Sequence, residues 1–337
     1  MQSQLCNKMN CTDEGASAVT AGGGTPVEGG EEVAAREALR AAVRQAKWHL
    51  GLVLFVAVSL PVVLIPRRIA VGLGGMAGSL AFRLLPRVRR TAVGNIRESL
   101  PYLATLPEWD PACGTPEAIA RRTFANYGRT VVEVLKLYYG CGAGLMERVE
   151  FRGMEHYERA REKGKGILFV TGHCGNWELM ALTFGARFAD VAVVARRQKF
   201  PRFNGLLNRL RHGFGNSVIY AEGAARSIFF RLRKRGIVGI LIDQAVQENE
   251  GGVVDFLGRG AWTTTMPAVV AARTGAPLLP IFIHREGGRH VVTIHPEVPA
   301  PSDDPLDGTR RLNRAIEGQI ASHPDEWLWV YRRWKRT

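Results

Sequence analysis

The stretch Gly166-Ile-Leu-Phe-Val-Thr171-Gly-His173-Cys-Gly-Asn-Trp-Glu178 decides the fold, because it reads as a strand, a turn and the beginning of a helix. Residues 166–171 form a continuous apolar run that is rich in strand-favouring residues, which is typical of a strand buried on both faces. The glycines on either side of His173 favour a turn directly after this strand. Asn176 can then cap the first turn of a helix.

The same texture recurs through the second half of the chain, where apolar runs alternate with stretches of helical spacing. Fully apolar strands that alternate with helices indicate an α/β fold with a mainly parallel sheet. Gly287-Gly288 joins the last two runs, so we expect these to form an antiparallel hairpin at the sheet edge. The further predicted strands are 191–194, 217–220, 237–242, 277–284 and 290–295. The predicted helices are 177–188, 201–213, 223–235 and 264–274.

Composition divides the chain into three predicted regions. Residues 1–30 are rich in Gly, Thr, Ser and Ala and are predicted to be a disordered tail, because they offer too little apolar surface to fold. Residues 31–148 are predicted to be a helical, membrane-anchoring region. Residues 149–337 are predicted to form the α/β core.

Two interpretations of the apolar segment at 49–66 stay open. It is shorter than the roughly 20 residues of a spanning helix and contains Pro61, so a buried core helix is one of them. Cations lie at both of its edges, which is typical of a helix anchored among anionic headgroups, and we therefore predict a membrane anchor. The cations are Arg36, Arg40, Arg44, Lys47, Arg67 and Arg68, followed by a basic cluster at 86–90.

The formal net charge of the 337-residue chain is +14, and this excess of cations favours anionic partners. Such a field attracts nucleic acid, an anionic membrane surface or a phosphorylated substrate, and charge alone does not choose among them. The five cysteines are irregularly spaced without a CxxC pair, so neither a disulfide framework nor a zinc site is predicted.

His173 is the strongest candidate for chemistry, because active sites of parallel sheets collect where strands end. Glu178 follows after five residues, so the two would not share a face of one ideal helix. If His173 lies in the turn, however, the carboxylate can fold back onto the imidazole and leave the other ring nitrogen free to take a hydroxyl proton. The alternative is a capping histidine beside a solvated glutamate.

Other kinds of active site find less support. A serine nucleophile elbow requires Gly-x-Ser-x-Gly, which the sequence lacks. Cys174 adjoins His173, but adjacent side chains rarely point at each other, so we expect it to serve local packing. His156 and His212 show no spacing that completes a zinc site, and no metal is predicted.

Three further residues are candidates for substrate binding. Arg196 and Asp243 each follow or end a predicted strand, which places both at the expected edge. The guanidinium of Arg196 can grip a phosphate or stabilise an oxyanion, and the alternative is a solvated arginine. Asp243 can instead cap a helix or pair with a structural arginine. Asn176, which can also cap the helix, is the third candidate.

Seven stretches occur in an order that resembles a known enzyme family. The segment 172–178 resembles the His-x4-Asp/Glu motif of glycerolipid acyltransferases, and it is most similar to the version in the late (lauroyl/myristoyl-type) lipid A biosynthesis acyltransferases. The resemblance runs from about residue 48 to 335. The other matching stretches are 89–96, 125–129, Arg196, 242–244, 255–277 and 327–335. The chain departs from the family pattern at Cys174, Arg197 and Tyr331.

The resemblance implies a glycerolipid-acyltransferase-like α/β core with O-acyltransferase activity and no cofactor beyond the acyl donor. Acyl carrier protein or coenzyme A would carry the acyl chain, and a hydroxyl of a lipid A precursor or related glycolipid would accept it. His173 would be the general base and Glu178 its orienter. The implied partners are the membrane lipid and acyl carrier protein, without nucleic acid or metal. The implied location is the cytoplasmic face of the cell inner membrane.

The resemblance leaves other acceptors open, such as phosphatidylinositol mannoside or a lysophospholipid. Outside enzymes, the alternative is a basic membrane-peripheral or nucleic-acid-binding protein, since cations and aromatic residues alternate at 327–336. Beside a membrane anchor, we expect this carboxyl-terminal segment to lie at the headgroup interface instead.

Overall fold

A computed structural model describes residues 59–197, 201–299 and 304–335, together with separate positions between 36 and 57. The chain divides into two units, Met1–Ala57 and Val58–Thr337, and the helices and strands from α2 onward belong to the second. The predicted tail at 1–30 lies outside the described residues.

Among the elements whose bounds the structure describes, three long helices and the short α5 precede the first strand. Helices α3 and α4 begin at a proline, which is favourable in the first helical turn because that N–H has no partner there. The hydroxyl of Thr115 accepts a hydrogen bond from Ala118 N–H and caps α4. The helices are α2 (Arg67–Leu84), α3 (Pro86–Leu103), α4 (Pro116–Tyr138) and α5 (Ala143–Met146).

Within the described part of the chain, no helix taken alone combines the length and hydropathy of a membrane span. Helices α2 and α3 together meet both criteria, but the chain bends by 94° between them. The predicted anchor at 49–66 is only partly described, and it stays a prediction.

The second half of the chain contains a seven-stranded sheet in the order β1-β9-β8-β2-β5-β3-β4. All neighbouring strands are parallel except β8 and β9, which form an antiparallel hairpin, so the predicted α/β class with a mainly parallel sheet is confirmed. The prediction that this hairpin lies at the sheet edge is wrong, because β1 pairs with the outer side of β9. The strands are β1 (Val149–Arg152), β2 (Ile167–Thr171), β3 (Val191–Ala195), β4 (Ser217–Tyr220), β5 (Ile237–Leu241), β8 (Leu278–Glu286) and β9 (Arg289–Ile294).

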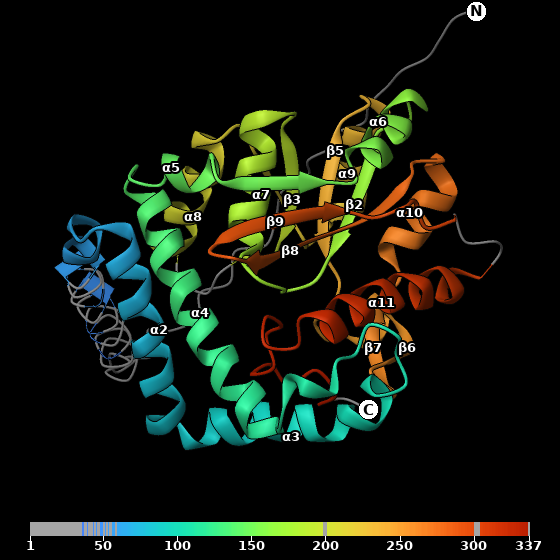
Figure 1. The fold of residues 1–337 in the computed structure, drawn as a ribbon. Helices are drawn as coiled ribbons and strands as arrows, with labels where there is room; N and C mark the ends of the chain where they lie inside the picture. The colour runs from blue at the N-terminus through green and yellow to red at the C-terminus, as the bar shows by residue number, and fades with distance from the viewer. Residues whose placement is uncertain are drawn as a thin grey trace, which may run out of the picture. The chain divides into compact units, whose positions relative to one another are not determined.

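Both faces of the sheet are buried, as its apolar strands require. Along β2, Ile167 and Phe169 belong to one hydrophobic cluster, whereas Leu168 and Val170 belong to another. Figure 1 shows the helices distributed around the sheet, with α4 between α2 and the carboxyl-terminal helix α11, and α3 along the bottom of the view. These helices are α6 (Met154–Glu162), α7 (Trp177–Arg187), α8 (Pro201–Gly213), α9 (Ala224–Arg233), α10 (Met266–Thr274) and α11 (Pro305–Ser322). A separate hairpin of β6 (Gly251–Phe256) and β7 (Arg259–Thr264) packs against α11.

The register of β2 and β5 positions the site. Thr171 pairs with Leu241, and Ile242 N–H donates to Thr171 O at 3.1 Å, so both strands end at the same level. The residues that follow them, His173 on one side and Asp243 on the other, therefore leave the sheet side by side.

A buried ionic cluster joins α4 to the sheet and to the histidine turn. Arg285 of β8 donates to both carboxylate oxygens of Glu133 at 2.6 and 2.8 Å, and His290 of β9 lies 3.1 Å from the same carboxylate. Asn176 adds a hydrogen bond from its amide at 2.9 Å. Burial opposes the charge of Glu133, but the hydrogen bonds from His290 and Arg285 hold its pKa far below its usual range. The cluster thus fixes where the helix after the turn begins.

Helices α2 and α4 pack with their backbones in contact, because glycines line the crossing. A Cβ atom on Gly128 would lie 2.1 Å from the carbonyl oxygen of Gly74 and 3.1 Å from the Cα of Gly78. No side chain can be accommodated there unless the helices move apart.

We therefore expect Gly128→Ala to lower the free energy of unfolding by about 1–3 kcal/mol, the usual cost of overpacking. Gly94→Ala is the matched control, because a Cβ at this helical position of α3 meets nothing within 4 Å. The control should be neutral or stabilising by up to about 1 kcal/mol, since alanine favours helix. Denaturant unfolding of both variants measures the difference, and equal effects would contradict the packing argument.

Candidate active site

The centre of the site is a histidine held by a buried carboxylate. His173 donates twice to Asp243, from its backbone N–H to Oδ2 and from Nδ1 to Oδ1, both at 2.7 Å. The indole Nε1 of Trp327 donates to the same Oδ2, also at 2.7 Å. The Asp243 side chain is 2% exposed and that of His173 is 18% exposed. The histidine is accordingly fixed at both its backbone and its ring.

The proton positions follow from the charge on Asp243. Burial opposes ionisation, but the positive charge available on His173 and the hydrogen bonds from His173 and Trp327 outweigh it, so the pKa of Asp243 lies below its usual value. An ionised carboxylate at Nδ1 requires the ring proton on that nitrogen, which leaves a lone pair on Nε2. The side-chain nitrogen of Gln244 lies 3.2 Å from this Nε2. The arrangement can accept a proton from a substrate hydroxyl.

Glu178 is not the group that orients His173, contrary to the prediction. Helix α7 begins at Trp177, so Glu178 does lie in the first helical turn, but its carboxylate points toward α8. There Arg211 donates to both of its oxygens, at 2.7 and 2.8 Å. A two-pronged pair with a guanidinium satisfies the carboxylate fully, and Asp243 takes the contact with the imidazole.

The other predicted substrate-binding residues have different positions. Asn176 is completely buried and caps α7 by accepting from Leu179 N–H at 3.0 Å, so its role is structural rather than binding of substrate. Asp243 is a partner of the histidine and not a surface for substrate. Arg196 follows β3 with its side chain 55% exposed, 3.5 Å from Glu250. Among these residues the structure brings only Asp243 to His173.

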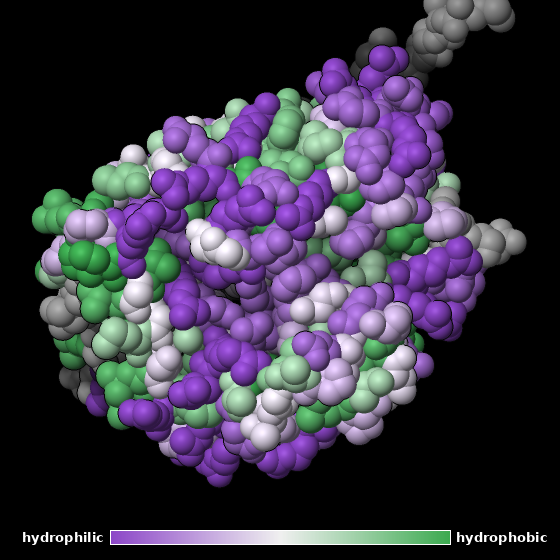
Figure 2. Space-filling view, in the orientation of Figure 1, coloured by the Kyte–Doolittle hydropathy of each residue, from purple (hydrophilic) through white to green (hydrophobic). Residues whose placement is uncertain are grey.

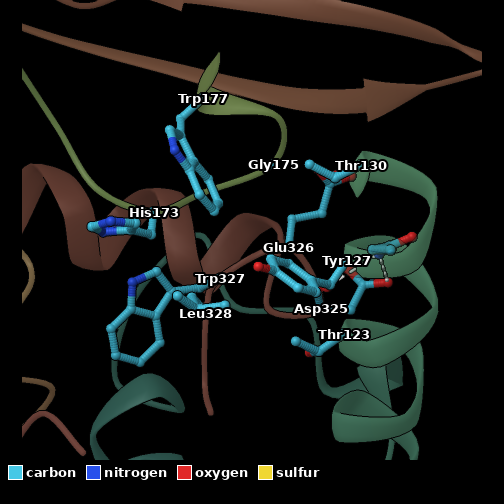
Figure 3. A pocket seen from close by; sticks show the side chains of 11 residues that line it. Thr123, Tyr127, Thr130, His173, Gly175, Trp177, Asp325, Glu326, Trp327 and Leu328 are labelled. Atoms are coloured by element: carbon cyan, nitrogen blue, oxygen red, sulfur yellow. Dashed lines mark hydrogen bonds between the residues drawn. The ribbon is translucent and has the colours of Figure 1, made fainter. Parts of the chain in front are cut away.

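A pocket lies on the backbone side of His173. Figure 3 shows the imidazole between Trp177 and Trp327, pointing away from the end of the pocket where Tyr127 lies. The ring of Trp177 meets the imidazole edge-to-face at 4.9 Å between centroids. The lining residues are Thr123, Asn126, Tyr127, Thr130, His173, Gly175, Trp177, Asp325, Glu326, Trp327 and Leu328.

Cys174 is a packing residue, as predicted. It is 2% exposed and forms a β-bridge with Trp327, and burial raises the pKa of its thiol well above the ordinary value. Gly175 completes the turn with a φ of +56°, where a Cβ would lie 2.3 Å from the carbonyl oxygen of Ile283. The turn therefore excludes any larger residue at 175.

Residues 41–336 match the family model of the bacterial lipid A biosynthesis acyltransferases. The chain belongs to this family. The resemblance seen in the sequence is thereby confirmed, and the chain is an O-acyltransferase.

Several relatives carry acyltransferase names. A phosphatidylinositol mannoside acyltransferase of Mycolicibacterium smegmatis is 25% identical over 66% of this chain and 75% of its own length. The lipid A biosynthesis myristoyltransferase of Escherichia coli is 24% identical over 76% of this chain and 77% of its own length. The lipid A biosynthesis lauroyltransferase of Escherichia coli is 25% identical over 84% of this chain and 89% of its own length.

The carboxyl-terminal segment of this acyltransferase was predicted to lie at a headgroup interface. In the structure it is part of the core instead. Trp327 and Trp329 are 1% and 0% exposed, and Arg333 is 0% exposed. Arg333 donates to the backbone carbonyl of Trp262 and the hydroxyl of Thr263, and its guanidinium lies 5.1 Å from the ring centre of Phe256. The buried cation of this segment thus contacts an aromatic ring of β6, and the segment's tryptophans pack in the core.

Sequence reasoning missed the roles of Trp327, Arg211 and Gln244 in this acyltransferase site. Gln244 carried a signal, because it directly follows Asp243 at the carboxyl end of a buried strand. Trp327 lay in the stretch 327–335 that resembles the family, but nothing local indicated its contact with Asp243; Arg211 carried no signal, since its contact with Glu178 spans 33 positions.

The buried carboxyl of Glu326 makes the stability of the fold depend on pH near neutrality. Burial raises the pKa of this carboxyl to about 7, although the Arg285 N–H donates to it at 2.9 Å. The folded chain therefore keeps a proton that the unfolded chain releases near its ordinary pKa, so stability falls as pH rises from about 5 through 7.

We expect Glu326→Gln to remove this slope, because the amide has a similar shape and does not ionise. As pH rises from 5 to 8, the unfolding free energy of the unsubstituted chain should fall relative to that of the variant by on the order of 2–3 kcal/mol. Glu147→Gln, at an exposed glutamate, is the control and should run parallel to the unsubstituted protein. Denaturant unfolding at several pH values decides, and a pH-independent difference for Glu326→Gln would refute the expectation.

Proposed function

We propose that this acyltransferase moves a fatty acyl chain from a thioester to a hydroxyl of a glycolipid, with His173 as the general base. The observation that carries the proposal is the 2.7 Å hydrogen bond between His173 Nδ1 and Asp243, which leaves a lone pair on Nε2. Asp243 has the role that the prediction gave to Glu178.

In the proposed reaction, Nε2 takes the proton of the acceptor hydroxyl while the hydroxyl oxygen bonds to the thioester carbonyl carbon. The tetrahedral intermediate then breaks its C–S bond, and the leaving thiolate takes the proton from Nε2. The ionised Asp243 stabilises the imidazolium between these two proton transfers.

Glu178 acts at a distance from the reacting atoms. Its two-pronged pair with Arg211 ties the first turn of α7 to α8, and α7 begins directly after the histidine turn. We therefore assign Glu178 a positioning role.

Charge supports an anionic donor and acceptor. With a net charge of +14, the surface suits acyl carrier protein or coenzyme A as donor and a phosphorylated glycolipid as acceptor. Arg196 is the candidate for the phosphate, because it follows β3, and β3 pairs with β5, the strand that precedes Asp243. A lipid A precursor is the first candidate acceptor, and phosphatidylinositol mannoside is the second, favoured by the names of the relatives at 25–27% identity.

We further propose that the enzyme binds the cytoplasmic face of the inner membrane through α2. The side of α2 opposite the glycines is apolar and exposed, and Figure 2 shows hydrophobic surface gathered on the side where α2 lies in Figure 1. Its residues recur every three or four positions, which places them on one helical face. They are Ile69, Leu73, Met76, Leu80 and Leu84. The adjoining cations Arg67, Arg68, Arg83, Arg87 and Arg90 suit anionic headgroups.

The proposed chemistry predicts a specific order of activity losses. His173→Ala should lose at least about 100-fold in kcat, the usual contribution of a general base. Asp243→Asn should lose a similar or larger factor, because an amide cannot stabilise the imidazolium. Glu178→Gln should lose less, since it acts through Arg211.

The assay follows transfer of a labelled palmitoyl group from palmitoyl-CoA, and from acylated acyl carrier protein, to a lipid A precursor and to phosphatidylinositol mannoside. The acceptor with the higher kcat/KM identifies the glycolipid class. Unchanged transfer by His173→Ala would end the proposal, and a loss by Glu178→Gln larger than that by Asp243→Asn would restore the original assignment of the orienting carboxylate.

Membrane binding through α2 predicts that Met76→Glu weakens adsorption to vesicles of phosphatidylethanolamine and phosphatidylglycerol by roughly tenfold or more. The reason is the loss of about 1.5–3 kcal/mol for burying such a side chain. Phe230→Glu on α9 is a control of similar exposure, 61% against 69%, and the same change of charge. Co-sedimentation measures binding, and equal losses for the two variants would argue against α2 as the contact.

A further inference from the structure

Gln244 is the protein group that faces the proton-accepting atom of the site. Its side-chain nitrogen lies 3.2 Å from His173 Nε2. Because Nδ1 donates to the ionised Asp243, Nε2 has a lone pair, and only the NH₂ end of the amide can pair with it. The amide therefore presents donors toward the reacting atoms.

We propose that Gln244 is a catalytic residue, whose side-chain amide donates a hydrogen bond to the thioester carbonyl oxygen as negative charge develops there. This inference rests on the proposed function and deepens it, since it names the group that stabilises the oxyanion. Arg196, the candidate from the sequence, has Glu250 as its ion-pair partner instead.

The geometry leads to this role because two donors cannot share one lone pair. When the acceptor hydroxyl arrives, it takes the place of the amide at Nε2, about 3 Å from the ring nitrogen. The carbonyl carbon under attack is bonded to that same hydroxyl oxygen in the intermediate. The carbonyl oxygen is bonded to that same carbon, so it lies two bonds from the oxygen that has displaced the amide. The amide itself started 3.2 Å from Nε2, and it is therefore close to the carbonyl oxygen.

The backbone at this position is held rigidly while the side chain of Gln244 is partly exposed. Asp243, the preceding residue, accepts hydrogen bonds from three N–H groups, and Ile242 donates to the neighbouring strand. Moving the amide from Nε2 to the carbonyl oxygen needs only rotation of a side chain. A fixed donor of this kind costs little reorganisation during the reaction.

The amide exchanges no proton, so the balance of the reaction is unchanged. The proton passes from the acceptor hydroxyl to Nε2 and from there to the leaving thiolate, while the C–O bond forms and the C–S bond breaks. The amide stabilises the tetrahedral oxyanion between these steps.

Two substitutions and a control test the proposal. Gln244→Ala removes the donor and should lower kcat by about 100- to 1000-fold with little change in KM, the usual effect of deleting one oxyanion donor. Gln244→Glu keeps the shape but replaces the donor by an acceptor. It should lower kcat at least as far. Gln247→Glu adds the same charge to an exposed position of the same loop and should leave kcat unchanged.

The pH profile of kcat/KM separates this role from a structural one. A carboxylate opposite Nε2 favours the doubly protonated ring, so Gln244→Glu should move the acidic limb of the profile to higher pH. The other acidic groups around His173, namely Asp243 and the pocket residues Asp325 and Glu326, are the same in every variant.

The outcomes distinguish the two proposals. Loss of activity in His173→Ala together with unchanged kcat in Gln244→Ala would overturn the role of Gln244 and leave the proposed function intact. Full activity in His173→Ala would overturn the proposed function itself. If Gln244→Ala does not fold, Gln244→Glu decides alone: a normal kcat with an unshifted acidic limb would overturn the inference.

Discussion

The site depends on one carboxylate that accepts hydrogen bonds from three N–H groups. Asp243 lies two residues after β5, and it holds the backbone and ring of His173 after β2 as well as the indole of Trp327 from the carboxyl-terminal segment. Two segments far apart in sequence thus converge on one side chain. Because hydrogen bonds to a charged group contribute more than neutral ones, the buried carboxylate stays ionised and fixes the tautomer of its histidine.

The second constraint is the buried cluster around Glu133, which fixes the other end of the histidine turn. Burying a carboxylate and a guanidinium costs several kcal/mol for each ion, so such a pair adds little net stability. It does specify geometry: Arg285 and His290 hold Glu133, and Glu133 accepts from Asn176, the cap of α7. His173 therefore lies between a strand end and a helix start that are both fixed by ionic contacts.

The sheet could be predicted from the sequence because its inner strands are continuous apolar runs, whereas β1, β6 and β7 lack such a pattern. The histidine of the candidate site could also be predicted, from its position after β2. Its partner could not, because the parallel register of β2 and β5 brings together residues 70 positions apart, and Glu178 was the carboxylate nearest in sequence. Sequence proximity favoured Glu178, which in the folded chain pairs with Arg211 instead.

The carboxyl-terminal segment is a second case in which the local sequence pattern did not reveal the contacts made in the fold. Its alternating cations and aromatic rings suit a surface, yet Trp329 and Arg333 are buried, and Asn95 of α3 donates to the backbone carbonyls of Trp329 and Tyr331 at 2.8 and 2.9 Å. Helix α3 adjoins α2, the proposed membrane-contacting helix, and the same segment supplies Trp327 to the catalytic carboxylate. A displacement of α3 at the lipid surface would therefore act on the segment that holds Asp243. In the proposed function, the membrane-contacting helix and the histidine site are joined through hydrogen bonds donated by the side chains of Asn95 and Trp327, rather than through a charged patch.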